Sequence, residues 1–334
     1  MKILNFGILA TGKIAHRLAT TMRDSKSCRL VAAASRSESK ARHFADEFGV
    51  EAVTGYAELL LRDDIDAVYV ATPHPQHYEW CLQAIEHGKH ILCEKPFTMK
   101  VAEAESLHAA AHQKGILIME AFMYRFHPQT RRLVELIKEG AIGDVRWIHA
   151  DFGFASDYNP ASRLFANSLG GGGILDVGCY TVSMTRMIAG AAQGKAFLDP
   201  VEIKSFGRLN EGEGTDWLAG ALMDFPGDLL ATVRCAMRFK VGQAVRIEGT
   251  KGIIELNEPW FAGAKGATIR VKTEVEELII ETETSEDLYS FMLDEFALCW
   301  REGRVESPIM SPSDSLGNIR VLEEWYRQVG VVYV

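Results

Sequence analysis

Residues 2–15, KILNFGILATGKIA, decide the fold with which this chain begins. Apolar residues dominate as far as Ala10, which is typical of a strand buried on both faces of a parallel sheet. A turn containing glycine follows, and the segment after it has helical periodicity. In such an arrangement the backbone N–H groups of the turn and the helix N-terminus can bind a pyrophosphate.

This turn matches only part of the GxGxxG fingerprint of dinucleotide-binding domains. The three positions fall on Ala10, Gly12 and Ala15, so only the middle glycine is present. Alanine at the other two positions is sterically mild, but the match is weak by itself, and an ordinary strand-to-helix turn is the alternative. The residues expected to bind the dinucleotide here are Ala10, Thr11, Gly12, Lys13 and Ile14.

The remainder of the first half repeats this alternation of short apolar runs and helical segments. The apolar runs are 29–35, 66–72, 90–93 and 116–120, and the helical segments include 39–49, 76–88 and 100–114. Strands that alternate with helices pair in parallel, and the helices cover both faces of the sheet. The sequence therefore predicts an α/β domain with a doubly wound parallel sheet.

From about residue 125 the chain changes to longer runs in which apolar and polar residues alternate. These runs are 145–154, 201–209, 217–225, 229–238, 244–249 and 268–280, with one strong helical segment at about 173–189. Such alternation is typical of antiparallel strands with one buried and one exposed face. The second part is therefore predicted to be an α+β domain, an open-faced and mostly antiparallel sheet with helices on one face.

The length of the chain supports this division into two domains. Its 334 residues exceed the roughly 250–300 at which one hydrophobic core stops growing. We expect a dinucleotide-binding domain over 1–123 and a domain for substrate binding and dimerisation over 124–334. The final helix, 313–329, is able to pack back on the first domain.

Charge and composition indicate a small-molecule ligand. The net charge of −9 disfavours nucleic acid and anionic membrane surfaces as partners, because both reward basic patches. The six cysteines lack metal-ligand or disulfide spacing, so we expect free thiols and no metal site. Residues 1–6 have no signal-peptide pattern, and no stretch reaches the ~18 apolar residues of a membrane span, so a cytoplasmic location is expected.

The end of the second apolar run indicates which nicotinamide dinucleotide is bound. An NAD-binding domain usually has Asp or Glu here to accept hydrogen bonds from the ribose, but this chain has Ser35, Arg36 and Ser37. A guanidinium can pair with a 2′-phosphate, which a carboxylate would repel. NADP is therefore favoured over NAD, and a solvated loop arginine is the alternative for Arg36.

The third apolar run ends at Thr72 and Pro73, and a helix opens through His77. Proline cannot extend the strand ladder, so it turns the chain across the expected cofactor crevice. Thr72, Pro73 and His77 are therefore candidate cofactor contacts. A histidine packed at the start of a helix is an equal alternative for His77.

Four segments carry a resemblance to a known family. They are AIEHGKHILCEKP at 84–96, EAFMYRFHPQ at 120–129, GAIGDVRWI at 140–148 and LGGGGILDVGCYTVSM at 169–184. In sequence and order they closely resemble the glucose–fructose oxidoreductase/inositol dehydrogenase/MocA-type (Gfo/Idh/MocA) family. GGGGILDVGCY, IEGTKGIIEL at 247–256 and the ending RQVGVVYV look most like its dimeric dihydrodiol dehydrogenase and NADP-dependent D-xylose dehydrogenase branch.

The resemblance implies an NADP-dependent oxidoreductase with an N-terminal Rossmann domain and a C-terminal sheet that forms a homodimer. The reaction implied is hydride transfer between nicotinamide and a carbon–oxygen centre of a sugar, polyol or trans-dihydrodiol. Alternatives are reduction of another keto or anhydro sugar, or exchange of hydride between two sugars on a retained nucleotide. A third, of another class, is a non-catalytic NADP-sensing regulator.

The resemblance also implies that Lys95 is catalytic and that the Lys95–Pro96 bond is cis. In an extended strand the adjacent Glu94 and Lys95 point to opposite faces, so one can face the cofactor while the other is held elsewhere. A surface Glu-Lys turn closed by proline is the alternative. By resemblance Glu120 and Arg125 lie near the nicotinamide, although Arg125 is equally a candidate for joining the domains.

Asp176 and Tyr180 form a second candidate pair. Their spacing of four residues places them on one face of the predicted helix after the glycine run. The helix N-terminus and Lys95 would favour the tyrosinate, which makes Tyr180 a candidate acid–base group where many relatives have histidine. Asp176 is expected to bind substrate hydroxyls or orient Lys95. The alternatives are a capping carboxylate and a half-buried core tyrosine.

Aromatic residues in the second half are candidates for the wall of a substrate pocket. They are Phe154, Tyr158, Phe165 and Trp260. Aromatic side chains form core more often than pocket walls, so we leave these four residues outside the predicted site.

Overall fold

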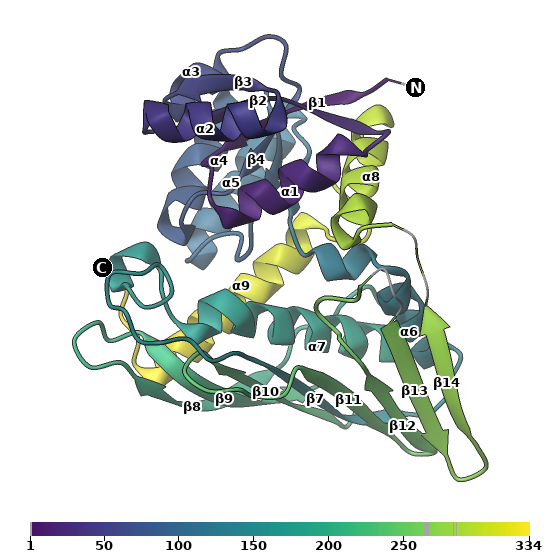
Figure 1. The fold of residues 1–334 in the computed structure, drawn as a ribbon. Helices are drawn as coiled ribbons and strands as arrows, with labels where there is room; N and C mark the ends of the chain where they lie inside the picture. The colour runs from purple at the N-terminus through teal and green to yellow at the C-terminus, as the bar shows by residue number, and fades with distance from the viewer. Residues whose placement is uncertain (1, 264–266, 283, 285) are drawn as a thin grey trace. The chain divides into compact units, whose positions relative to one another are not determined.

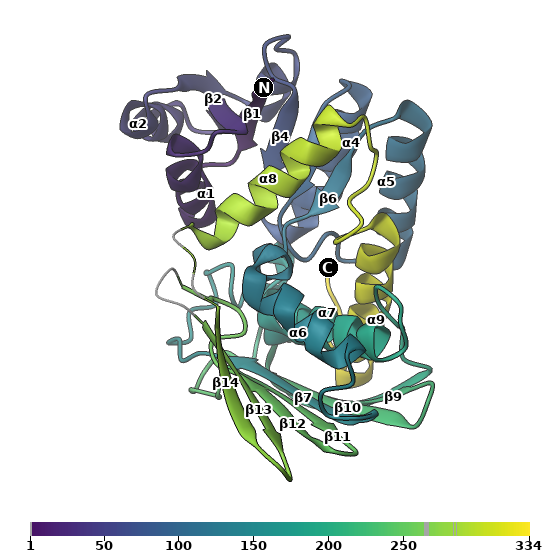
Figure 2. The same ribbon diagram turned by 90° about the vertical axis from the view of Figure 1, so that its right-hand side faces the viewer.

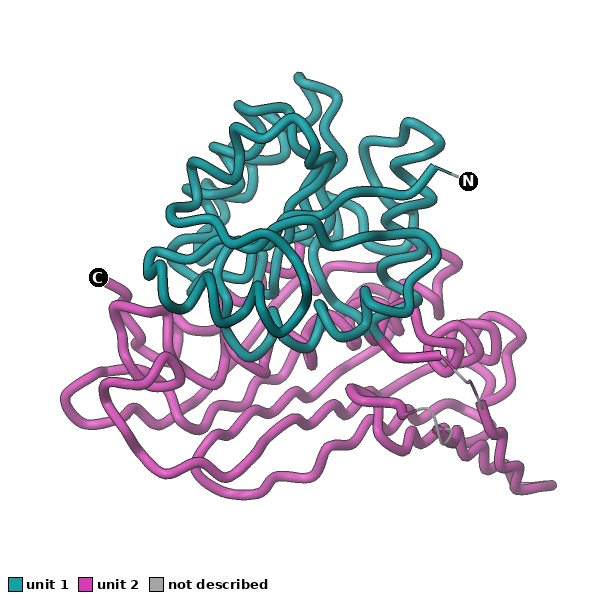
Figure 3. Tube along the Cα trace, turned by 45° about the horizontal axis from the view of Figure 1, so that its top comes forward, with its two compact units in different colours: residues 1–123, 289–316 teal, residues 124–288, 317–334 magenta. Residues whose placement is uncertain are grey.

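A computed structural model describes residues 2–263, 267–282, 284 and 286–334 and divides the chain into two compact units (Figure 3). Unit 1 comprises residues 1–123 and 289–316, and unit 2 comprises 124–288 and 317–334. The predicted second domain over 124–334 is therefore interrupted. The returning segment, 289–316, contains nearly all of helix α8 (Leu288–Arg301), whereas the final helix from Gly317 onward groups with unit 2.

Apolar contacts explain why α8 groups with unit 1. The Phe296 ring lies 5.5 Å from the ring of Phe6 on the first strand. The Cys28 thiol donates a hydrogen bond of 3.6 Å to the Leu293 carbonyl. Helix α8 is thus part of the hydrophobic core of the unit that the first strand begins.

Within the described part of unit 1, six parallel strands form one sheet in the order β3-β2-β1-β4-β5-β6 (Figure 1). All four residues of β4 are buried, which requires cover on both faces because successive side chains alternate. The strands are β1 Leu4–Leu9, β2 Cys28–Ser35, β3 Glu51–Thr54, β4 Ala67–Val70, β5 His90–Cys93 and β6 Ile118–Glu120. The other helices are α1 Lys13–Arg23, α2 Glu38–Phe48, α3 Tyr56–Leu60, α4 His77–Glu86 and α5 Val101–Lys114.

Eight strands form the sheet seen among the described residues of unit 2, in the order β14-β13-β12-β11-β7-β10-β9-β8. Neighbours are antiparallel except β7 and β10. The strands are β7 Val145–Gly153, β8 Glu202–Leu209, β9 Asp216–Phe225, β10 Leu229–Ala236, β11 Ala244–Gly249, β12 Gly252–Leu256, β13 Ala267–Thr273 and β14 Glu277–Thr282.

Helices cover one face of this second sheet. They are α6 Pro128–Lys138, α7 Cys179–Ala192 and α9 Pro312–Val329. Figures 1 and 2 show them on the same side, and no described helix lies on the other. The predicted fold class, a doubly wound parallel sheet followed by an open-faced, mostly antiparallel one, is confirmed.

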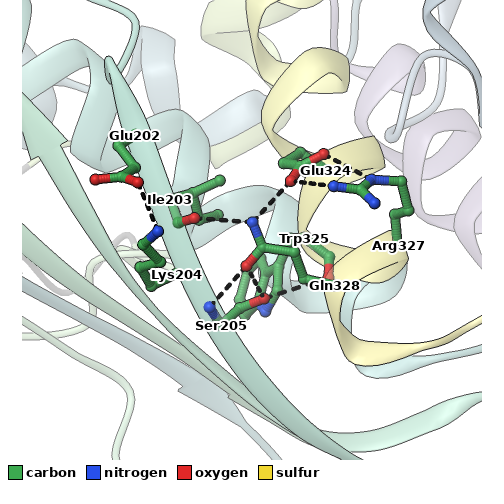
Figure 4. Close-up of polar contacts among 8 residues, drawn as sticks. All are labelled: Glu202, Ile203, Lys204, Ser205, Glu324, Trp325, Arg327 and Gln328. Carbon is green, nitrogen blue, oxygen red and sulfur yellow. Dashed lines mark hydrogen bonds and ion pairs between the residues drawn. The ribbon is translucent and has the colours of Figure 1, made fainter.

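Helix α9 reaches the outer edge of strand β8 through Gln328 (Figure 4). The side-chain amide donates to the Ile203 carbonyl at 2.8 Å, and its oxygen accepts from the Ser205 backbone N–H at 2.9 Å. These two backbone groups point away from β9, the only strand beside β8 in the sheet as described. Gln328 therefore pairs with an edge strand as a neighbouring backbone would, which satisfies groups that strand edges leave open.

Two details of the second half differ from the sequence prediction. The run over 268–280 is a hairpin of β13 and β14 rather than one strand, and its turn exposes 94% of Val275. Helix α6 was not predicted, although its apolar residues do follow a helical period. No helix in the described ranges combines the length and apolar character needed to span a membrane.

Candidate functional site

Unit 1 brings its predicted site residues to one edge of the parallel sheet. Strands β2, β1, β4 and β5 are successive neighbours, so their carboxyl ends lie side by side. The segments that follow these strands hold the predicted residues Ala10–Ile14, 35–37, 72–73 and 94–95. Ligands of open parallel sheets bind at this edge, because the loops there and the helix N-termini face the crevice.

The first of these turns has the backbone form of a dinucleotide loop. Ala10 has a φ of 76°, the left-handed region that favours glycine, so alanine is strained here rather than sterically mild. A Cβ placed on Gly12 would meet no described atom within 4 Å. Gly12 is also the N-cap of α1 and provides no side-chain cap, so the first N–H groups of the helix can face a phosphate. The turn fits the pyrophosphate of a dinucleotide.

At the end of β2 the structure places an exposed arginine and a buried serine. Ser35 is 7% exposed and accepts a 3.3 Å hydrogen bond from the Ser37 N–H, whereas Arg36 is exposed and bonds the Tyr56 hydroxyl. The nearest carboxylate in the sequence, Glu38, pairs with Arg42 at 2.5 Å. This arrangement suits an anionic 2′-phosphate better than a pair of ribose hydroxyls.

His77 is a packed histidine that joins two loops of this edge. Its ring is fully buried, and its two nitrogens lie 2.9 Å from the carbonyl oxygens of Thr72 and Pro96. Burial lowers the pKa of His77, so the ring is neutral and donates through one nitrogen at a time. The geometry favours the structural alternative over a cofactor contact. The Lys95–Pro96 bond beside it is cis, as the resemblance implied.

The two acidic residues predicted near the cofactor support the loop that carries Lys95. Glu94 is 7% exposed and accepts a hydrogen bond from the Tyr69 hydroxyl. Glu120, almost fully buried on β6, accepts from the Phe97 N–H at 2.8 Å. Lys95 is only half-buried, so it is the member of the Glu94–Lys95 pair at the accessible edge.

In unit 2, Asp176 and Tyr180 lie on either side of a change in helix type. Residues Ile174–Gly178 form a π-helical turn, and α7 starts at Cys179. The predicted helix at about 173–189 is therefore present, but its first turn is π-helical and wider than an α-helical turn. Such single π turns occur frequently at functional sites. The space beside Gly178 is taken by Trp325, whose ring lies 3.0 Å from a Cβ placed there.

Arg163, which the sequence patterns did not reveal, pairs with Asp176. Its guanidinium Nη1 lies 3.1 Å from Asp176 Oδ1. The Asp176 side chain is 8% exposed and that of Arg163 is 56% exposed, so the pair reaches from the helix to the surface of unit 2. Arg163 belongs to an irregular loop thirteen positions earlier, and no periodic pattern links it to Asp176.

Three aromatic rings fix the position of Tyr180. The ring centroids of Phe152, Tyr124 and Trp260 lie 5.3, 5.8 and 5.9 Å from that of Tyr180, which is 5% exposed. Trp260 is one of the four aromatic residues left outside the predicted site, and it is fully buried against Tyr180. Because rings contact Tyr180 on several sides, its phenol keeps one orientation. An acid–base group requires such a fixed orientation.

Arg125 lies in unit 2 and bonds helix α7. It is 4% exposed, and its Nη1 donates to Ser183 Oγ at 3.2 Å, where the Tyr124 hydroxyl also donates at 2.8 Å. Arg125 thereby joins the short helix Met123–Phe126 to α7, one turn after Tyr180. This contact is with the helix that carries the site, and it stabilises the position of that helix.

A pocket of about 460 Å³ lies elsewhere in unit 2, between β8 and α9. Of its charged side chains, Glu202 pairs with Lys204 at 2.6 Å, and Glu324 pairs with Arg327 at 2.7 Å (Figure 4). The described residues also contain no group of three or more His, Cys, Asp or Glu that could hold a metal ion.

Comparison with known families matches both halves of the chain. Residues 4–122 match the model of an oxidoreductase family with an NAD-binding Rossmann fold, GFO_IDH_MocA. Residues 130–255 match the GFO/IDH/MocA C-terminal domain. Among curated proteins, the trans-1,2-dihydrobenzene-1,2-diol dehydrogenase of Mus musculus is 31% identical over 348 residues, which cover 99% of this chain and 98% of the relative.

Two enzymes are among the solved structures that resemble nearly the whole chain. The 3-ketoreductase KijD10 from Actinomadura kijaniata, in complex with NADP and TDP-benzene, is 27% identical with a TM-score of 0.86, over 96% of each chain. The aldose-aldose oxidoreductase from Caulobacter crescentus, complexed with glycerol, is 25% identical with a TM-score of 0.87, over 98% of each chain. Solved forms of KijD10 include one variant with a lysine replaced and one with a tyrosine replaced.

The strain at Ala10 makes a stability prediction. Ala10→Gly should raise the free energy of unfolding by about 0.5–1 kcal/mol, because relief of a left-handed alanine exceeds the added entropy of a glycine. Urea unfolding measures this change. The control Ala15→Gly, inside α1, should lower the stability by about 1 kcal/mol. A loss of stability in Ala10→Gly would contradict the strained backbone described here.

Proposed function

Because the chain belongs to the GFO/IDH/MocA oxidoreductase family, we propose that it is an NADP(H)-dependent enzyme acting on a sugar, polyol or trans-dihydrodiol. The reaction is hydride transfer between the nicotinamide and a carbon–oxygen centre of the substrate. The observation that carries the proposal is the half-buried Lys95 at the carboxyl edge of the parallel sheet, the same edge that holds the open turn at Gly12.

Residues of unit 1 hold the nucleotide in this proposal. The turn from Ala10 to Ile14 and the N-terminus of α1 bind the pyrophosphate, and Arg36 with Ser37 binds the 2′-phosphate. Thr72 and Pro73 line the same edge, whereas His77, Glu94 and Glu120 support its loops through hydrogen bonds to Thr72, Tyr69 and Phe97. The bound nicotinamide supplies the hydride donor or acceptor.

The protein's own side chains handle charge and protons at the substrate oxygen. The Lys95 ammonium stabilises the developing alkoxide, and the Tyr180 hydroxyl gives or takes the proton. Asp176, held by Arg163, accepts hydrogen bonds from neighbouring substrate hydroxyls and so orients the substrate. KijD10 has been solved as a variant at a lysine and as a variant at a tyrosine, which are the two residue types proposed here as catalytic.

A second candidate function is hydride exchange between two sugars on a nucleotide that stays bound. The similarity to an aldose-aldose oxidoreductase is the observation that favours it. An enzyme of this kind should co-purify with its nucleotide, which the absorbance spectrum of the purified protein reveals. A silent regulator is less favoured, because Lys95, Asp176 and Tyr180 are all present in this chain.

We further propose a homodimer formed through the helix-free face of the unit 2 sheet. Strand register places Phe206, Leu222, Leu230 and Trp147 on that face, and Phe206 is 83% exposed. Contiguous exposed apolar side chains are typical of protein interfaces. The proposed location of the protein is the cytoplasm, which its free and buried cysteines support.

The catalytic role is tested first by Lys95→Met and Tyr180→Phe. Each should reduce turnover by at least about a hundredfold, because each removes one charge or proton group while leaving the aliphatic stem or the aromatic ring. Turnover is measured by nicotinamide absorbance with a panel of aldoses, polyols and diols. The exposed Lys100→Met is the matched control and should retain full activity. Unchanged turnover in Lys95→Met would end the catalytic assignment.

The cofactor preference is tested by Arg36→Asp. This change should weaken NADP binding by tenfold or more and leave NAD binding within about threefold, because a carboxylate repels only the cofactor with a 2′-phosphate. Fluorescence titration with each reduced nucleotide measures both dissociation constants. Arg42→Ala, an exposed arginine on α2, serves as the control. Equal losses for the two nucleotides would exclude the phosphate contact.

The dimer is tested by Phe206→Glu. A charge within the proposed apolar interface should halve the mass measured by light scattering, while turnover per chain is retained. Val275→Glu, in the exposed β13–β14 turn, is the control and should leave the mass unchanged. A wild-type protein with the mass of one chain would disprove the dimer, and a dimer that persists in Phe206→Glu would disprove this interface.

A further inference from the structure

We infer that Asp216 and Tyr333 are positioning residues. They hold the backbone of the π turn Ile174–Gly178 and thereby fix the position of Asp176. The inference rests on the proposed function for the role of Asp176. Neither residue belongs to the cofactor edge of unit 1 or to the aromatic rings around Tyr180. Both are in unit 2 and act on the glycine run that precedes the π turn.

Asp216 caps the π turn from a different element. It is the first residue of β9, it is fully buried, and its Oδ2 accepts a hydrogen bond of 2.9 Å from the Ile174 N–H. The Gly173 N–H is also hydrogen-bonded to this carboxyl group. Gly173 occupies the N-cap position and has no side chain, so Asp216 does what an N-cap side chain normally does.

Gly172 fits against both positioning residues. Its φ is 121°, and a Cβ placed there would lie 2.5 Å from Asp216 Oδ1 and 3.2 Å from the Tyr333 hydroxyl oxygen. Only glycine allows this approach. The Gly172 carbonyl in turn accepts the Asp176 N–H at 3.1 Å. The backbone that Asp216 and Tyr333 touch is therefore the backbone that sets the position of Asp176.

Tyr333 fixes the same run from the other side. Its hydroxyl donates a 2.8 Å hydrogen bond to the Gly171 carbonyl. Asn167 holds the flanking residues in place, donating to the Val332 carbonyl at 2.9 Å and accepting from the Val334 N–H at 3.0 Å. Burial raises the pKa of Tyr333 well above its ordinary value, so the hydroxyl stays a donor at physiological pH. The C-terminal residues Val332–Val334 are thus hydrogen-bonded to Asn167 and to Gly171 of the glycine run.

The charge of Asp216 is secondary to its position as an acceptor. Burial raises the pKa of Asp216 to about 7, and the neighbouring Asp176 charge adds to the shift, against the hydrogen bonds from the backbone. Both the neutral acid and the carboxylate have an oxygen that can accept the Ile174 N–H. An amide keeps that acceptor, so Asp216→Asn is a conservative variant and Asp216→Ala removes the contact.

Three variants test the inference by kinetics. Asp216→Ala and Tyr333→Phe should lower kcat by roughly tenfold to a hundredfold, because a small displacement of a reacting group is enough to do so. The dissociation constant of NADP should stay within twofold, since its proposed ligands are in unit 1. Asp216→Asn should recover most of the lost kcat. The control Asp224→Ala changes an exposed residue of the same strand and should match the wild type.

A second measurement does not depend on a substrate. Hydrogen–deuterium exchange of the peptide covering 171–178 should become faster in Asp216→Ala and Tyr333→Phe, and exchange over 90–100 should not change. Unchanged exchange over 171–178 would overturn the inference, as would faster exchange combined with a wild-type kcat. If Asp216→Ala does not fold, Tyr333→Phe decides the matter, because it removes a single hydroxyl group.

The two proposals fail in different ways. A wild-type enzyme without turnover on the whole panel of aldoses, polyols and diols overturns the proposed function. In that case the exchange experiment still decides whether Asp216 and Tyr333 hold the turn. A wild-type enzyme that turns over normally, with variants that lose neither kcat nor protection of 171–178, overturns the positioning role and leaves the proposed function standing.

Discussion

The parallel pairing of the strands in unit 1 is the constraint on which the rest of its site depends. Each strand must run in the same direction, so every strand delivers its next residues to one edge of the sheet. The strained Ala10, the exposed Arg36 and the half-buried Lys95 come from separate strands and meet at that edge for this reason. The fold therefore fixes where these residues lie, and the identity of each side chain determines the chemistry at that edge.

In unit 2 the described helices cover only one face of the sheet, and the candidate residues lie at the start of one of these helices. Helix α7 packs against the strands, and Asp176 and Tyr180 lie on either side of its first residue. A π turn precedes the helix and widens its first turn. The first backbone N–H groups of any helix lack hydrogen-bond partners within that helix. The buried Asp216 satisfies two of those groups from a neighbouring strand. The aromatic rings around Tyr180 then leave it little freedom to move.

Secondary structure that follows a periodic pattern could be predicted from the sequence. Contacts between residues that are distant in the sequence could not. The alternation of strands and helices, the second sheet and the segment of Asp176 and Tyr180 follow from periodicity and motif. Arg163 and Asp216 reach the site through the tertiary fold, and neither stands at a spacing that indicates a partner. The small size of Ala10 does not reveal its strain, because its backbone angle depends on the turn as a whole. Helix α8 lies far along the chain from the strands whose core it completes.

The contact of Gln328 with strand β8 has a consequence for how copies of this protein can associate. An edge strand with open backbone groups can recruit a strand from another molecule and extend the sheet without limit. Here a side-chain amide from α9 already occupies the positions at Ile203 and Ser205. A second chain would have to displace that amide before it could add a strand. Addition of a strand from another molecule at this edge is therefore opposed at these two positions.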